Sequence, residues 1–217
     1  MSESISLENT TKRKHTQARG RERRLALLQA ARELLNERDM GQITLPSVAE
    51  HAGIATSSTY HFYPDIRELF KDLAASIADE MINSPLDLPS PGTWEDLVRS
   101  YTKAACDFYS QDIAARQLML GIKTDPEIKR AGCAKEAGFG DALMSLLEKY
   151  FILPALENPG QIFFRAIQIA DAMFMISVEE NDRLTEEYVE EACRAKVAYL
   201  ELYLPKYLPR KNHLDLS

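Results

Sequence analysis

A glycine at position 53 separates two short segments, and this break restricts the fold more than any other feature of the sequence. Before it, Thr44 is a good helix N-cap and the small Ala49 allows close crossing of a neighbouring helix. This first segment stops at Gly53 because glycine adopts the positive φ of a sharp turn at no steric cost. After the turn, residues 56–63 can form a second helix that Pro64 closes. The sequence therefore predicts two short helices joined by a glycine turn.

Helical periodicity also dominates the rest of the chain. Apolar residues at helical spacing predict a helix from Arg21 to about Arg38, and prolines around residues 85–92 interrupt the chain. Caps and first-turn prolines predict further helix starts at Thr93, Pro126, Pro159 and Thr185, the last of these helices ending near Pro205. No useful β-alternation occurs. The expected fold class is all-α, with an N-terminal three-helix domain containing the helix-turn-helix and a helical bundle after it.

The charges are distributed unevenly along the chain. Although the net charge is -7, residues 12–38 hold nine Lys or Arg against three acids. A basic N-terminal part and an acidic remainder are typical of a protein that meets a polyanion at one end. A solvated basic tail is the alternative explanation.

The second short helix supplies side chains that suit a DNA groove. Thr56, Ser57, Ser58, Tyr60 and His61 are short or aromatic donors that can enter a major groove and reach phosphates. The helix offers no Arg, Asn or Gln for bidentate base contacts, so specificity would rest on hydroxyls, thymine methyl groups, the basic arm and DNA shape.

Residues 44–69, TLPSVAEHAGIATSSTYHFYPDIREL, and the upstream LLQAARELL at residues 27–35 carry a family signature. They resemble the N-terminal domain of the tetracycline-repressor (TetR) family of transcriptional regulators. Asp39, Tyr63 and Ile66 depart from that pattern, where Gly, Phe and a phosphate-contacting Lys are usual. Ile66 cannot make that phosphate contact. Arg67 is charged, but it stands one position later and therefore points in another direction from the helix.

The resemblance implies a domain plan and a set of DNA contacts. Residues 1–18 are expected to be a flexible arm, residues 19–66 the DNA-binding domain, and residues 67–217 a helical domain for effector binding and dimerisation. The predicted DNA-binding residues are Arg21, Arg23, Arg24, Thr44, Thr56, Ser57, Ser58, Thr59, Tyr60 and His61.

For the second domain the resemblance implies an effector pocket and a four-helix dimer interface. Aromatic and methionine side chains suit an adaptable apolar pocket, for which the candidates are Phe108, Met119, Phe139, Met144, Phe163, Met173 and Phe174. Small and apolar residues of the last two helices predict a dimer contact through Ile162, Ala166, Ile169, Met173, Ala192, Ala195, Tyr199 and Leu202.

Other classes of function find little support. The large domain has no histidine base, and no nucleophile elbow or P-loop occurs, so we expect no enzyme, cofactor or metal. No stretch reads as a membrane anchor or secretory signal, which predicts a cytoplasmic protein. The expected function is a ligand-responsive regulator, usually a repressor, that binds a palindromic operator as a dimer. A helical protein-interaction adaptor and an effector-independent DNA-binding protein are the alternatives.

Overall fold

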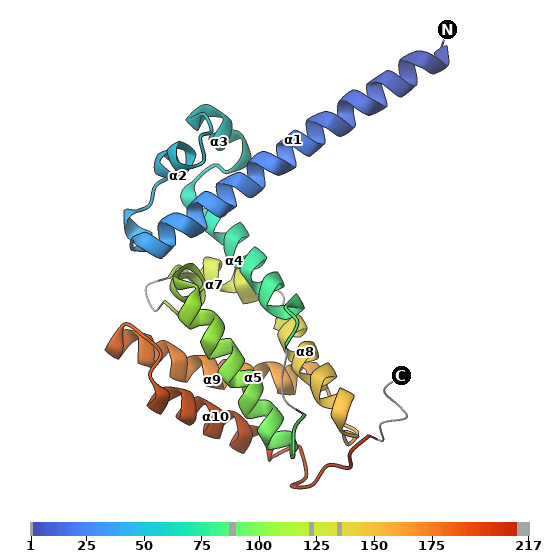
Figure 1. Cartoon of the computed structure of the whole chain (residues 1–217), viewed down its shortest axis with the longest axis vertical. Coiled ribbons are helices and arrows are strands. Elements are labelled where there is room, and N and C mark those ends of the chain that lie inside the picture. Colours follow the sequence, from blue (N-terminus) through green and yellow to red (C-terminus); the bar gives the residue numbers. More distant parts are fainter. Residues whose placement is uncertain (1, 87–89, 122–123, 134–135, 212–217) are drawn as a thin grey trace. The chain divides into compact units, whose positions relative to one another are not determined.

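The computed structural model describes residues 2–86, 90–121, 124–133 and 136–211, with side chains from residue 17 onward except at positions 133, 136 and 137. Its contacts divide the chain into two units, Met1–Leu73 and Ala74–Ser217 (Figure 1). The division falls within one helix, α4 (Ile66–Asn83), whereas the predicted boundary lies at the start of that helix. Part of the predicted linker, including Pro89, lies outside the described residues.

The first unit contains the two short helices that the sequence predicts. Its elements are α1 (Ser2–Glu37), a short 3-10 turn (Met40–Gln42), α2 (Leu45–His51), α3 (Thr56–Phe62) and the first turns of α4. Thr44 caps α2 reciprocally with Ser47: its hydroxyl accepts from the Ser47 N–H at 3.3 Å, and the Ser47 hydroxyl accepts from the Thr44 N–H at 3.0 Å. Gly53 has a φ of 64°, as the predicted turn requires.

Helix α1 is longer than the sequence analysis predicts. It begins at Ser2, so residues 2–18 continue the helix instead of forming an arm without regular structure. No proline or glycine occurs before Gly20, and the Glu, Lys and Arg residues of this segment are good helix formers. The prediction relied on missing apolar periodicity, which reports burial rather than helix formation.

The second unit is a helical bundle with one irregular turn. Its elements are α5 (Trp94–Gln111), α6 (Ile113–Ala115), the π-helical turn η2 (Arg116–Leu120), α7 (Pro126–Cys133), α8 (Glu136–Tyr150), α9 (Pro159–Asn181) and α10 (Glu186–Leu200). The helix starts predicted at Pro126 and Pro159 are confirmed. Helix α10 ends at Leu200 rather than near Pro205, because the chain turns back on itself at residues 201–204. No strand occurs among the described residues.

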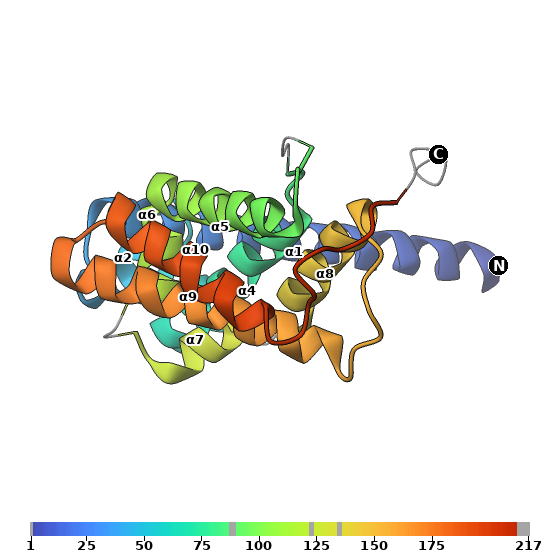
Figure 2. The same ribbon diagram turned by 90° about the horizontal axis from the view of Figure 1, so that it is seen from below.

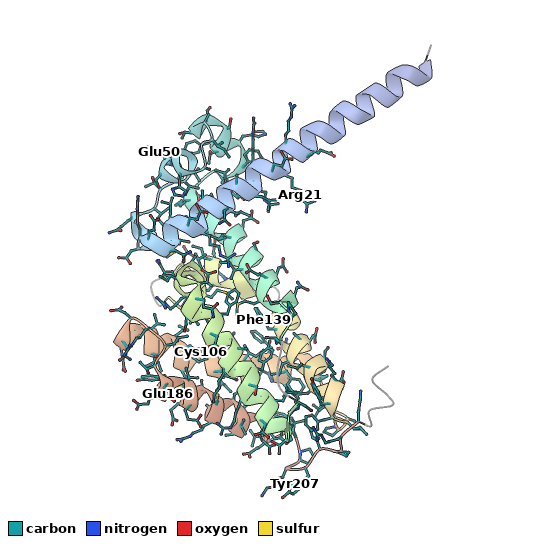
Figure 3. The ribbon with its side chains drawn as sticks, in the orientation of Figure 1. Arg21, Glu50, Cys106, Phe139, Glu186 and Tyr207 are labelled. Carbon is teal, nitrogen blue, oxygen red and sulfur yellow. The ribbon has the colours of Figure 1, made fainter. Side chains whose placement is uncertain are left out.

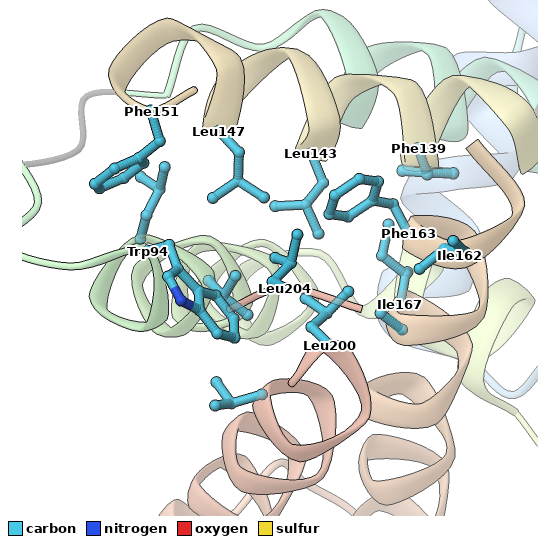
Figure 4. Packing of buried hydrophobic residues seen from close by; sticks show 14 of the residues in the cluster. Trp94, Phe139, Leu143, Leu147, Phe151, Ile162, Phe163, Ile167, Leu200 and Leu204 are labelled. Carbon is cyan, nitrogen blue, oxygen red and sulfur yellow. The ribbon is translucent and has the colours of Figure 1, made fainter. Parts of the chain in front are cut away.

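Aromatic and branched side chains fill the centre of the second unit (Figure 4). Trp94 from α5, Phe163 from α9 and Leu200 from α10 are at most 1% exposed. Helices α8 and α9 approach each other so closely that a Cβ at Gly140 would lie 2.4 Å from the Gly160 carbonyl oxygen. Glycine at position 140 is therefore required by helix packing.

Helix α9 is the central helix of this unit. It packs against α8 and against α10, and α9 and α10 lie side by side (Figure 2). By length and composition alone α9 could cross a membrane, contrary to the sequence-based expectation that no segment could. Its buried contacts with two neighbouring helices are those of a core helix in a bundle.

We predict that Gly53→Ala destabilises the first unit by about 1 kcal/mol, because alanine resists the positive φ of the turn. No atom lies within 4 Å of the added Cβ, so the loss reports backbone conformation alone. The measurement is urea unfolding followed by hydrogen exchange in α2 and α3.

Gly41→Ala is the matched control for this experiment. Gly41 also has open space around an added Cβ, but its φ is not positive. Equal stability of the two variants would contradict the role assigned to Gly53.

Candidate DNA-binding surface and ligand pocket

Helix α3 presents five of the ten predicted DNA-binding side chains to solvent. Thr56, Ser57 and His61 are exposed, Ser58 is partly exposed, and Tyr60 is 52% exposed. The side chains can be reached because the α2–α3 turn buries the opposite side of α3 against α2. This exposed set is the candidate DNA-reading surface.

Two other predicted DNA-binding residues have structural tasks. Thr59 is fully buried and its hydroxyl donates to the Ala55 carbonyl at 3.4 Å, so its assignment to DNA is wrong. It lies on the face of α3 that packs inward. Thr44 is exposed, but its hydroxyl already accepts the capping hydrogen bond of α2.

The three predicted arginines of α1 are not equivalent. Arg21 (Figure 3) and Arg23 are exposed. Arg24 binds Asp72 of α4 with two hydrogen bonds, from Nε at 2.8 Å and from Nη2 at 2.5 Å. This bidentate pair uses two of the five guanidinium N–H donors and holds α1 to α4, while the Arg24 side chain stays 55% exposed, so its contact with DNA stays a prediction.

Tyr63 completes the connection between α1 and α4. Its hydroxyl donates to Asp72 Oδ2 and accepts from Arg24 Nε at 3.3 Å. Burial raises the pKa of Tyr63, and the hydrogen bond to Asp72 acts in the same direction, so the hydroxyl stays protonated and donates. The departure from phenylalanine at position 63 therefore adds a donor for a carboxylate on α4.

The second unit contains a pocket lined by α4, α5, η2, α8, α9 and α10. Its volume is about 770 Å³, counting space that opens to solvent. Four of the predicted effector-binding residues line it, namely Phe108, Met119, Phe139 and Phe174. Phe163 belongs to the buried core, Met144 packs against that core, and Met173 is only partly buried, so these three do not line the pocket.

Sequence reasoning missed the polar residues of this pocket. Tyr101, Gln168, Asp171 and Lys196 line it beside the aromatic side chains. Lys196 could have been found, because it occupies the buried stripe of α10 formed by Val189, Cys193, Lys196 and Leu200. Lysine is rarely buried unless its charge is paired, so a lysine in an apolar helical stripe indicates that its ammonium has a role in the site.

The predicted dimer-interface residues separate into two groups. Ile162, Ala166 and Ala192 are at most 5% exposed within the single chain, so their assignment to a surface between chains is wrong. Their small or branched side chains pack α9 and α10 against neighbouring helices of the same chain. Ile169, Met173, Ala195 and Tyr199 remain partly exposed, and Leu202 is 75% exposed.

The family described as bacterial regulatory proteins, tetR family, matches residues 27–73, which contain the glycine turn and the exposed face of α3. The N-terminal part of the chain, residues 27–73, therefore matches the TetR family. This match, which contains the helix-turn-helix, indicates a DNA-binding transcription regulator. Among curated proteins, none matches the sequence.

Solved structures of the TetR family share the fold of this chain. A TetR transcriptional regulator from Rhodococcus sp. RHA1 has a TM-score of 0.65 and 17% identity over 83% of this chain and 96% of its own. A tetR-family regulator from Streptomyces coelicolor has a TM-score of 0.61 and 16% identity over 84% of this chain and 80% of its own. Thermus thermophilus FadR, a TetR-family repressor in complex with lauroyl-CoA, has a TM-score of 0.56 and 15% identity over 80% and 93%.

We predict that Tyr63→Phe destabilises the first unit by about 1 kcal/mol, since it deletes a partly buried donor to Asp72. Tyr60→Phe is the matched control, because the Tyr60 hydroxyl stands on the exposed surface of α3. Urea unfolding followed by hydrogen exchange in α1 and α4 measures both. A Tyr63→Phe variant as stable as the Tyr60→Phe variant would show that the hydrogen bond to Asp72 contributes nothing.

Proposed function

We propose that this regulator binds a palindromic operator as a homodimer, represses transcription, and is released when a small molecule enters the pocket of the second unit. The observation that carries the proposal is the exposed polar face of α3, held outward by a turn at which glycine has a positive φ. The cytoplasm is the compartment in which such a protein meets DNA.

Positioning and reading of DNA are assigned to different side chains. Arg21 and Arg23 carry charge on the exposed surface of α1, so they are proposed to contact phosphates without distinguishing sequences. Ser57, Tyr60 and His61 of α3 are proposed to read base edges or to fix α3 in the major groove. Arg24 pairs with Asp72, and its main role in this proposal is to connect α1 to α4.

The outward faces of α9 and α10 support a dimer. Ala172 and Ala198 are exposed, Ile169 and Ala195 precede them by three residues on the same helices, and Leu202 in the turn after α10 is largely exposed. Small exposed residues allow two helices to approach closely, and Leu202 offers an apolar side chain that is 75% exposed. We propose that these faces meet the same faces of a second copy.

Helix α4 gives the ligand a route to the DNA-binding unit. It begins in the first unit, where it carries Asp72, and its last turns place Met81 in the wall of the pocket. A ligand that favours one arrangement of α4 over another changes DNA affinity only by the difference between its affinities for the two arrangements. FadR, which shares the fold, is a repressor that binds lauroyl-CoA, and this supports a ligand pocket in the same unit.

We predict that the arginine and serine variants weaken DNA binding in different ways. Arg21→Ala or Arg23→Ala should weaken specific and random DNA alike, and should reduce the salt slope by about 0.9 for each phosphate that is no longer neutralised. Ser57→Leu should cost about 1–3 kcal/mol on the specific site alone. The measurement is a salt series on a site selected from random sequences and on a scrambled copy. Parallel losses on both DNAs for Ser57→Leu would remove α3 from sequence reading.

We predict that Ala198→Glu shifts the protein from dimer to monomer, because it places a charge in the centre of the proposed interface. Ala198 is exposed in the single chain, so the folded monomer tolerates the change. Ala155→Glu, an exposed alanine away from α9 and α10, is the control. Light scattering should give twice the chain mass of 24.6 kDa for the parent and the control, and the chain mass for Ala198→Glu. A parent protein that is monomeric at micromolar concentration overturns the dimer.

A further inference from the structure

Lys196 is a buried lysine that faces the pocket. It is 2% exposed, and its Nζ lies 4.8 Å from the centre of the Tyr101 ring. Within the part of the chain that the structure describes, its ammonium makes no hydrogen bond and no ion pair. The ring attracts the charge but accepts none of the three donors in the way an oxygen does. A buried ammonium in this state needs an acceptor.

Asp171 of α9 lines the same pocket but does not act as an acceptor for the Lys196 ammonium. It is partly buried, accepts a hydrogen bond from Gln168 Nε2 at 3.4 Å, and makes no ion pair with Lys196 within 4.0 Å. Burial raises the pKa of Asp171, against the effect of Lys196. Burial also lowers the pKa of Lys196, against the effects of Asp171 and Cys193. The pocket thus contains two opposite charges that are separated and poorly solvated.

The remaining wall of the pocket is mostly apolar, with Ser84 and Thr102 as its other polar residues. Phe108 and Met119 provide part of it, from α5 and η2, and Phe174 of α9 adds another ring. Tyr109 packs edge-on against Phe174 with ring centres 6.3 Å apart. A molecule bound here meets hydrocarbon on most sides and the Lys196 ammonium on one.

We propose that the pocket binds a small monocarboxylate whose carboxylate accepts hydrogen bonds from the Lys196 ammonium and whose aromatic or aliphatic body packs against Phe108, Met119 and Phe174. The binding of a carboxylate does not depend on the proposed function. The inference rests on that function only where it takes this carboxylate to be the molecule that releases DNA. Charge-assisted hydrogen bonds are the strongest that an ammonium makes, so a carboxylate outcompetes a neutral acceptor of the same shape. A cationic ligand would be repelled by Lys196.

Asp171 makes the binding depend on protons. A bound carboxylate lies near the Asp171 carboxylate, and protonation of Asp171 removes the repulsion between them. Tyr101 of α5 stays neutral near pH 7, because burial raises its pKa to about 12, and Cys193 of α10 also has its pKa raised by burial. Affinity for a carboxylate therefore falls as pH rises, since Asp171 and Lys196 both lose protons.

The test pairs acids with their neutral amides on the full chain. Phenylacetate, hydrocinnamate and octanoate are titrated by calorimetry beside phenylacetamide, hydrocinnamamide and octanamide. At least one acid should bind at least about tenfold more tightly than its amide near pH 6.5, and this preference should shrink toward pH 8.5. If no acid binds more tightly than its amide, the proposal is overturned.

Two substitutions locate the effect. Lys196→Met keeps the length of the side chain and should abolish the preference for acid over amide while leaving amide binding in place. Asp171→Asn should keep the preference and weaken its dependence on pH. Lys103→Met, at an exposed position of α5, is the matched control and should bind as the parent does. An unchanged preference in a folded Lys196→Met variant also overturns the proposal.

The result is separable from the proposed function. Operator affinity is measured with and without the tightest acid, and direct binding is measured without DNA. Lys196-dependent binding that leaves operator affinity unchanged supports the ligand class and contradicts the release mechanism. Release by a neutral amide that binds as tightly as its acid supports the mechanism and contradicts the ligand class.

Discussion

Close approach of helix backbones is the constraint on which both units of this protein depend. In the first unit Ala31 and Ala49 are fully buried, where α1 and α2 pack. In the second unit Gly140 of α8 lies so near the Gly160 carbonyl that a Cβ has no room. Larger side chains at these points would separate the helices and open voids that dense protein interiors do not tolerate. The exposed face of α3 and the pocket walls both lie on helices positioned in this way.

The local geometry of the DNA-binding unit could be predicted because its signals are local. Thr44 as a cap, Gly53 at the turn and Pro64 after α3 each act within a few residues, and the structure has them where the pattern predicts. The course of α1 before residue 19 could not be predicted in the same way. An exposed helix has no inward face, and its apolar periodicity is therefore absent.

Contacts between segments that lie far apart in the sequence could not be predicted. Small residues of α9 and α10 indicate that helices approach closely, but the pattern is the same for a neighbour in the same chain and for a neighbour in a second copy. Ala166 and Ala192 prove to pack within the chain, whereas Ala195 stays partly exposed. The pairing of Arg24 with Asp72 is equally invisible in a sequence, because 48 positions separate the two residues.

The polar residues of the pocket show why an apolar pattern alone underestimates a binding site. Lys196 lies in a stripe that otherwise packs, and burying it costs free energy that an apolar residue of similar volume would avoid. A direct ion pair with Asp171 would recover part of that cost, but the two groups do not form one. The ring of Tyr101 attracts the charge of the Lys196 ammonium but leaves its N–H donors without an acceptor. The ammonium is thus held in a position where its hydrogen-bonding capacity is open to a molecule in the pocket, and specificity follows from the polar atom that such a molecule brings.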